Sequence, residues 1–326
     1  MNLIELFDSL NIPEEKSVVT FNATPIPEFS SFRIAVNCEG YPVLLIPTDN
    51  SIRSLAFKNF KLKYLQLEQS IECKITESGN ETTNKFTVIT FTSNERGLQE
   101  YFLKISETFI KTLNTKANSQ QIIDALIRFV EVFRALNELP TKTVQGLWSE
   151  LFFIYNSKNP EVLLNYWHNL PEEKFDFNFG VEKIEVKSSA SMERIHIFAS
   201  EQLNPLEDQQ VLIVSLFVRP SNTGISIENL VDFISNKVKD PDLIQKLNSI
   251  VGRTLGSTLE QSIGLKYDLQ IAKESCKLYR HQDIKKIEKV DIPDEVHEVK
   301  YKSDLTHVSS IDITTLTNKQ ILFQSI

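Results

Sequence analysis

Cysteine and histidine are scarce in this sequence, and neither forms a metal-binding pattern. The three cysteines, Cys38, Cys73 and Cys276, lie far apart, which excludes the close spacing of a cysteine metal site. The five histidines include no HExxH pair, so we do not expect zinc. An odd number of scattered cysteines fits a reducing compartment, and we therefore expect a cytoplasmic protein.

Long apolar runs, targeting signals and nucleotide-loop motifs are also missing. No stretch approaches the roughly 20 apolar residues of a membrane helix, so we expect no membrane partner. The N-terminus, MNLIELFDSL, contains acids and no basic region, unlike a secretory signal. The glycines at residues 252–264 include no GxxxxGK[ST] loop, so the sequence predicts no ATPase of this kind.

Basic residues do not outnumber acidic ones. The chain has 35 Lys and Arg against 43 Asp and Glu, which gives a net charge of −8. This balance argues against a simple nucleic-acid coat protein and predicts weak DNA binding without metal. It does not exclude a nuclease, because a metal ion can lie between carboxylates and phosphate. The 326 residues suffice for about two domains of ~150 residues each.

The most informative polar residues lie at positions 175–202, which read FDFNFGVEKIEVKSSASMERIHIFASEQ. Glu185 and Lys187 are two apart in a strand-like run, so their side chains point to the same face. Asp176 lies in the preceding strand-like run, and a tight turn at Gly180 would pair the two strands as a hairpin. Two carboxylates and a lysine would then share one polar face. Such a set suits Mg²⁺, with the lysine orienting a water.

A second carboxylate-bearing segment lies upstream. Glu150 is part of VQGLWSELFFIY, residues 144–155, where the spacing of Leu147, Leu151 and Ile154 predicts a helix. A carboxylate among apolar residues indicates a function, and a place on the helix surface is the alternative. The Glu-x-Lys pair also has an alternative interpretation, an exposed ion pair that contributes under about 1 kcal/mol.

Taken together, these residues resemble the PD-(D/E)XK nuclease superfamily. Glu150 on a helix is followed by Asp176 and then by Glu185-x-Lys187. Within that superfamily, the phrases GLWSELFFI, DFNFG, IEVKSS and HIFASEQL are similar to the bacterial "PD-(D/E)XK motif protein" family. One departure is Phe175 in place of the nominal proline, which is commonly absent in relatives.

The resemblance implies a fold, a set of roles and a substrate. The fold would be α/β (α+β), with a restriction-endonuclease-like core that is a mixed four-stranded sheet flanked by helices. Asp176, Glu185 and Glu150 would hold Mg²⁺ or Mn²⁺, Lys187 would be the catalytic lysine, and Gln202 would support the site. Genes of the family often lie beside restriction or phage-defence genes, which implies DNA as the substrate.

The pattern along the chain predicts four segments. Residues 1–94 read as a β-rich N-terminal domain, in which LKYLQLEQ and IECKITES are separate strands. The run QVLIVSLFVRP predicts a central strand covered on both faces. The other segments are a helical connector at 95–140, the nuclease core at 141–255 and a C-terminal extension at 256–326.

Further residues are candidates for substrate binding. Lys285 and Lys286 lie in the most basic stretch of the chain and are candidate phosphate contacts, with a solvated surface as the alternative. Ser188 and Ser189 directly follow Lys187 and are also candidates. His168, a lone histidine, is interpreted more readily as structural than as a substrate contact.

We therefore predict a Mg²⁺-dependent DNA endonuclease of restriction-modification or phage-defence type. Homodimerisation is expected, because cutting both strands of a duplex needs two sites or two events, and restriction or defence proteins are further expected partners. The alternative is a nuclease-fold DNA-binding or assembly subunit of a multi-protein defence complex, with cleavage absent or partner-dependent. An enzyme acting on RNA or on a small phosphoester is a third interpretation.

Overall fold

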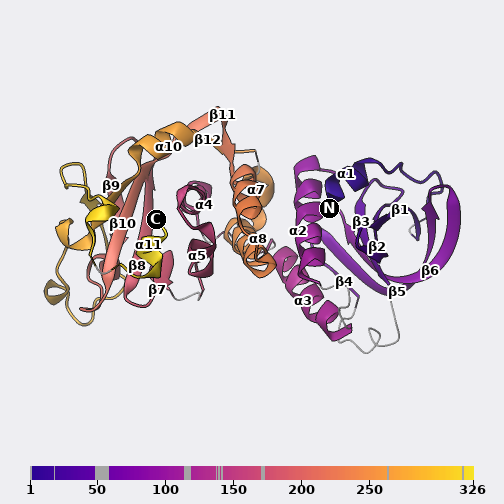
Figure 1. Cartoon of the computed structure of the whole chain (residues 1–326), viewed down its shortest axis with the longest axis horizontal. Helices are drawn as coiled ribbons and strands as arrows, with labels where there is room; N and C mark the ends of the chain where they lie inside the picture. Colours follow the sequence, from indigo (N-terminus) through magenta and orange to yellow (C-terminus); the bar gives the residue numbers. More distant parts are fainter. Residues whose placement is uncertain are drawn as a thin grey trace. The chain divides into compact units, whose positions relative to one another are not determined.

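The computed structural model describes residues 2–17, 19–47, 59–113, 119–136, 138, 140, 142–169, 173–262, 264–317 and 319–326. The chain is a mixed α+β protein, as predicted (Figure 1). No described helix combines the length and the apolar character that a membrane span needs. The chain forms two compact units. The first unit is Met1–Thr141 with Leu255–Glu260, and the second unit is Lys142–Thr254 with Gln261–Ile326.

The first unit is built around a closed, barrel-like sheet. Its strands are β1 (Thr20–Ile26), β2 (Phe29–Val36), β3 (Pro42–Pro47), β4 (Phe60–Lys61), β5 (Leu65–Glu77) and β6 (Asn80–Phe91). Five of them pair in the order β1-β2-β3-β6-β5, and a parallel pairing of β5 with β1 closes the ring. Alternate side chains, including Phe21, Leu45 and Val88, fill the interior.

The long strand β5 corrects one expectation from the sequence. LKYLQLEQ and IECKITES were predicted to be separate strands, but residues 65–77 form one. Its register against β6 shifts between Glu68 and Ile71, and Ser70 has a φ of 54°. A β-bulge interrupts the alternation of side chains and bends a strand without ending it. The interrupted pattern therefore predicted a boundary where the backbone continues.

Three helices flank the barrel in Figure 1: α1 (Leu3–Asp8), α2 (Arg96–Thr112) and α3 (Ser119–Ala135). Phe102 of α2 and Phe129 and Phe133 of α3 pack with Phe91 of β6. The ring centroids of neighbouring pairs in this group lie 5.0–6.1 Å apart. These aromatic rings form a core between the helices and the sheet.

The second unit contains a four-stranded mixed sheet. Its strands are β7 (Phe177–Phe179), β8 (Glu182–Ser189), β10 (Gln210–Phe217) and β13 (Lys277–Arg280), in the order β13-β10-β8-β7. β8 and β10 are parallel, and the outer pairings are antiparallel. β10 is the apolar run that was predicted to be central. β7 and β8 form the predicted hairpin, and Gly180 at its turn has a φ of 48°, which glycine adopts without strain.

Further helices and strands lie within residues 142–326. The helices are α4 (Val144–Asn156), α5 (Pro160–Asn165), α6 (Ser200–Leu203), α7 (Ile227–Lys237), α8 (Pro241–Leu255), α9 (Leu259–Ser262), α10 (Leu269–Ser275) and α11 (Ile321–Gln324). The strands are β9 (Ile195–Ala199), which pairs with β14 (Lys300–Asp304), and β11 (Pro220–Ser226), which pairs with β12 (Lys266–Tyr267). α4 packs on both β8 and α7.

The C-terminal segment packs within the second unit. β13 is an edge strand of the four-stranded sheet, and the fully buried Glu182 of β8 holds the start of α11. The carboxylate of Glu182 accepts the backbone N–H groups of Gln320 at 2.6 Å and Phe323 at 2.9 Å. Residues 261–326 thus pack with residues 142–254, while the four-segment division of the chain stays a prediction.

Candidate active site

Asp176 lies directly before β7 and is fixed by the neighbouring strand. Its Oδ2 accepts the backbone N–H of Val186 at 2.8 Å. Val186 stands between Glu185 and Lys187 in β8, so this one hydrogen bond places Asp176 beside both. Asp176 is only 4% exposed, and a buried carboxylate needs such a donor to offset its lost hydration.

Glu185 and Lys187 point to the same side of β8, as the period of a strand requires. Lys187 Nζ lies 2.7 Å from Glu185 Oε1 and donates to Gln202 Oε1 at 3.0 Å. Gln202 is itself fixed, because its Oε1 accepts the N–H of Ala199 at 3.1 Å and its Nε2 donates to the carbonyl of Lys174 at 3.1 Å. Gln202 therefore holds the Lys187 ammonium in one position.

Glu185 has an unusual protonation equilibrium. Burial and, to a smaller extent, the negative charge of Asp176 raise its pKa to about 7, although Lys187 opposes both effects. Near neutral pH the carboxyl group is therefore divided between its neutral and ionised forms. A cation bound nearby would favour the ionised form.

The helix α4 positions Glu150. Its N-terminus is capped by Thr143, whose Oγ1 accepts the N–H of Gly146 at 3.1 Å. Farther along, the indole N–H of Trp148 donates to the carbonyl of Ile225 at 2.8 Å and fixes the rotation of the helix. This rotation turns Glu150 inward, where it is 3% exposed, so the surface interpretation of Glu150 is wrong.

Several donors stabilise the ionised form of Glu150. Its Oε2 accepts the indole N–H of Trp167 at 2.8 Å, and His168 Nε2 lies 2.7 Å from the same oxygen. Burial acts to raise the pKa of Glu150, but the hydrogen bond from His168 and the charge of Lys142 outweigh it and lower the pKa to about 2. The carboxylate is therefore negative at neutral pH.

Two residues that the sequence analysis did not assign to the site complete this cluster. Lys142 Nζ donates to Glu150 Oε1 at 2.6 Å and to Asp176 Oδ1 at 2.7 Å. It also lies 3.1 Å from His168 Nε2. No spacing in the sequence indicates Lys142. His168, for which a structural role was favoured, could have been suspected only from its place before the DFNFG segment.

One comparison with known proteins identifies a family. A family model described as "Putative PD-(D/E)XK family member, (DUF4420)" matches residues 3–306. The chain belongs to this PD-(D/E)XK family. The match includes Glu150, Asp176, Glu185 and Lys187 and confirms the resemblance seen in the sequence. No curated protein and no solved structure matches the chain significantly.

Members of the PD-(D/E)XK superfamily usually use divalent metal ions, and the donor set of this chain fits one. Oxygens of Glu150 and Asp176 and a nitrogen of His168 lie within 4.8 Å of one another. Carboxylate oxygens suit Mg²⁺ and Mn²⁺, and an imidazole nitrogen suits the softer transition metals better than Mg²⁺. The ammonium of Lys142 already lies among these donors, which shows that the cluster accommodates a cation.

The two candidate serines of this PD-(D/E)XK chain lie at the end of β8. Ser188 Oγ accepts a hydrogen bond from Gln145 Nε2 at 3.1 Å, and Ser189 Oγ lies 3.0 Å from Ser191 Oγ. These contacts do not link either serine to the carboxylates. Ser189 is 8% exposed, whereas Ser188 is half-buried and more accessible to a substrate.

The two candidate lysines differ in their surroundings. Lys286 Nζ donates to the carbonyl of Leu203 at 3.1 Å and lies 3.4 Å from Glu288, so it anchors the end of α6. Lys285 is exposed. Only Lys285 presents its side chain to solvent in the way that a phosphate contact requires.

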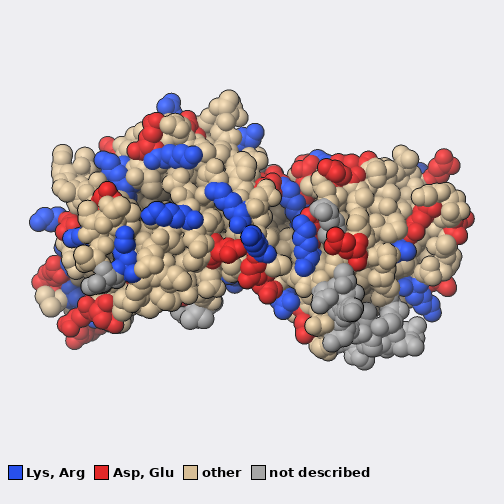
Figure 2. Space-filling view, viewed as in Figure 1, with Lys and Arg blue, Asp and Glu red and all other residues tan. Residues whose placement is uncertain are grey.

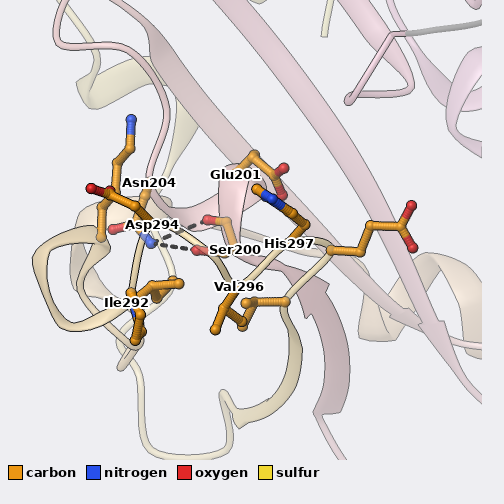
Figure 3. A pocket seen from close by; sticks show the side chains of 11 residues that line it. Ser200, Glu201, Asn204, Ile292, Asp294, Val296 and His297 are labelled. Carbon is orange, nitrogen blue, oxygen red and sulfur yellow. Dashed lines mark hydrogen bonds between the residues drawn. The ribbon is translucent and has the colours of Figure 1, made fainter.

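A separate pocket of about 390 Å³ lies beside α6 (Figure 3). It is lined by Ser200, Glu201, Asn204 and residues of the segment 289–299. Asn204 Nδ2 donates to the carbonyl and to the hydroxyl of Ser200, both at 3.2 Å (dashed in Figure 3). None of the clustered carboxylates lines this pocket. Acidic residues outnumber Lys289 among its lining residues, so the pocket does not suit a phosphate.

Proposed function

We propose that this chain is a divalent-metal-dependent DNA endonuclease of restriction-modification or phage-defence type, with Mg²⁺ or Mn²⁺ as its ion. One observation carries the proposal: Asp176, Glu185 and Lys187 converge at the β7–β8 hairpin, with Glu150 beside them on α4. Membership in the PD-(D/E)XK family supports a nuclease. In this proposal the four-stranded sheet of the second unit is the restriction-endonuclease-like core.

The residues divide the chemistry among them. A bound divalent cation offsets negative charge on a phosphate and lowers the pKa of an attacking water. Asp176, Glu185 and Glu150 supply the carboxylates that would hold it. Lys187, fixed by Glu185 and Gln202, would hold the water near the phosphate through its ammonium group. Gln202 acts through Lys187 and is a positioning residue.

The distribution of charge on the second unit supports the proposal of a polyanionic substrate, although the net charge of the chain is −8. Figure 2 shows Lys and Arg side chains across the middle of the visible face of this unit, with many acidic side chains toward its lower margin. A local basic surface can approach a phosphate backbone although the whole chain is acidic.

Plasmid cleavage in Mg²⁺ or Mn²⁺ tests the proposal. Wild type is expected to nick or linearise the plasmid, and Asp176→Ala and Lys187→Ala are expected to abolish cutting. Exposed residues of the same types, in Asp208→Ala and Lys302→Ala, provide matched controls that should cut normally. Cutting retained in both active-site variants would show that another site is responsible. Single-stranded RNA in the same assay tests the third interpretation.

A second candidate function is a DNA-binding or assembly subunit whose cleavage depends on a restriction or defence partner. The observation that favours it is the position of Lys142, whose ammonium group lies between two of the proposed metal ligands. No cleavage by any sample, together with DNA binding by wild type, would select this candidate. Light scattering of the same samples would test the expected homodimer.

A further inference from the structure

The ammonium of Lys142 and a divalent metal ion would compete for one place. Lys142 Nζ lies 2.6 Å from Glu150 Oε1 and 2.7 Å from Asp176 Oδ1, which are distances of charge-assisted hydrogen bonds. A Mg²⁺ ion bound by the same two oxygens would lie about 2.0–2.1 Å from each. On the side of these oxygens that faces Lys142, a point so close to both oxygens lies in space that the ammonium now fills.

We propose that Lys142 is a tethered cation that occupies the metal position in the resting protein and withdraws when a divalent ion binds. The inference rests on the proposed metal site, but not on nuclease activity. It assigns to Lys142 a regulatory role that is separate from that of Lys187. Lys187 contacts Glu185 and Gln202, whereas Lys142 contacts Glu150 and Asp176.

The charges in the cluster favour exchange over joint occupancy. Three carboxylates, those of Glu150, Asp176 and Glu185, face two lysines. If a divalent ion bound while both lysines stayed, the buried cluster would carry an excess of positive charge. If Lys142 left, the ion and Lys187 would together balance the three carboxylates. Since uncompensated charge is costly at buried positions, binding of the ion and departure of Lys142 are coupled.

His168 shows that the present arrangement leaves one close contact unsatisfied. Its Nε2 lies 2.7 Å from Glu150 Oε2, an acceptor, and 3.1 Å from Lys142 Nζ, a donor. If Nε2 carries a hydrogen, it donates to the Glu150 carboxylate, but it then faces a second donor, the Lys142 ammonium. If Nε2 carries no hydrogen, it accepts from the Lys142 ammonium, but it then faces a second acceptor, the Glu150 carboxylate. A metal ion in place of the ammonium would bind the bare nitrogen and the carboxylates together.

The backbone holds His168 in this place. Its φ is 45°, a left-handed conformation that residues other than glycine rarely adopt. Lys246 of α8 donates to the carbonyls of Leu164 at 2.7 Å and Asn165 at 2.9 Å, just before the turn. Strain maintained by surrounding contacts is common at ligand sites.

Lys142 can leave without disturbing the fold. Its side chain is 35% exposed, whereas those of Glu150 and Asp176 are 4% and 6% exposed. It precedes Thr143, which caps α4, so its stem lies outside the helix. Rotation of the stem would carry the ammonium to the surface, where a phosphate of the substrate is a suitable new partner.

Isothermal titration of the full chain with Mn²⁺, without nucleic acid, tests the proposal. We expect Lys142→Met, which keeps the apolar stem and removes the charge, to bind Mn²⁺ about tenfold more tightly than wild type, or about 1.4 kcal/mol. Lys142→Arg keeps a cation and should bind no more tightly than wild type. Asp176→Asn, combined with Lys142→Met, should remove the gain.

A thermal melt of the same proteins is the second readout. Without its cation, Lys142→Met leaves two carboxylates uncompensated, so Mn²⁺ should raise its melting temperature more than that of wild type. If Lys142→Met is unstable without metal, Lys142→Gln replaces it in both experiments. Equal or weaker Mn²⁺ binding by the folded variant, or an equal rise in melting temperature, overturns the proposal.

The two proposals can fail separately. The chain could cut no nucleic acid but gain Mn²⁺ affinity when Lys142 is replaced. That result would support the tethered cation and contradict the proposed nuclease activity. A chain that cuts DNA, but whose Lys142→Met variant binds Mn²⁺ no better, overturns the tethered cation alone.

Discussion

At the residue scale, the buried carboxylates of Glu150 and Glu185 differ in pKa because their immediate neighbours differ. Burial acts to raise the pKa of Glu150, but the hydrogen bond from His168 and the charge of Lys142 lower it to about 2. Burial and the charge of Asp176 raise the pKa of Glu185 to about 7, although Lys187 opposes both. One cluster thus contains a carboxylate that is always charged and one that exchanges its proton near neutral pH.

The raised pKa of Glu185 predicts a pH-dependent stability. Folding favours its protonated form, so this stabilising contribution is complete below about pH 4.5 and is lost as pH rises through about 7. Glu185→Gln stays neutral at every pH. In the presence of a chelator, we expect this variant to be more stable than wild type at pH 8, by up to about 3 kcal/mol, and similar to it at pH 5.

Thermal melts at the two pH values measure this difference. Asp208→Asn, a change at an exposed acid, serves as the control and should show no such dependence on pH. A Glu185→Gln variant whose advantage over wild type is the same at pH 5 and pH 8 would contradict the assigned protonation.

Part of the site could be predicted from single residues, and part could not. The alternation of a strand places Glu185 beside Lys187, and the turn at Gly180 returns Asp176 toward them. Lys142 reaches Asp176 from 34 residues away, and no local pattern encodes a contact of that kind. The sequence therefore indicated the residues of the hairpin, but not Lys142, the cation that lies between Asp176 and Glu150.

At the element scale, Glu182 joins the end of the chain to the central sheet. Its carboxylate accepts two backbone N–H groups at the start of α11 while it is fully buried. Ser325 continues the attachment, because its carbonyl accepts the N–H groups of Lys158 at 2.8 Å and Asn159 at 3.1 Å. The short helix α11 is therefore held mainly by partners outside itself.

Glu182→Gln should weaken this attachment. The amide can accept only one of the two N–H groups well, and a charge-assisted hydrogen bond is lost. We expect the free energy of unfolding to fall by about 1–3 kcal/mol in chemical denaturation. Glu207→Gln, the same change at an exposed position, should leave stability within about 0.5 kcal/mol of wild type. Equal stability of the two variants would show that α11 contributes little.

The identity of the elements was easier to predict than their limits. The apolar run of β10 indicated a central strand because both faces are covered, and the structure places it between β8 and β13. The boundary inside β5 was wrong because the bulge near Ser70 interrupts alternation without ending the strand. The hydrophobic pattern indicates which residues are buried. It indicates the end of a strand only where the pattern of burial ends at the same residue.

At the scale of the whole molecule, closure of the barrel was outside the reach of the sequence. Pairing of β1 with β5 joins Phe21 to Ile75 across the three intervening strands. Such a contact depends on the accumulated twist and the length of every intervening strand, which local patterns do not encode. The sequence predicted a β-rich unit, while its closed form emerged only from the structure.

Under the proposed nuclease function, the net charge of −8 would make DNA binding depend on local surfaces, and Lys285 is the exposed candidate. Lys285→Glu should weaken DNA binding and reduce the slope of log affinity against log salt by about 1. Lys61→Glu makes the same charge change on the first unit and should leave the slope unchanged. Fluorescence anisotropy across a salt series measures both. An unaltered slope in Lys285→Glu would remove Lys285 from the interface.

The hydrogen bond from the Val186 N–H to Asp176 makes the proposed site depend on the register of β8. In β8 the same backbone position fixes Asp176, separates Glu185 from Lys187 and pairs with Val214 of β10. A slip of one residue would turn Glu185 and Lys187 toward the opposite face and leave Asp176 without its donor. Misregistered molecules should therefore lack the proposed site. A partly misfolded preparation should then contain fewer functional molecules, each with the same activity as in a fully folded preparation.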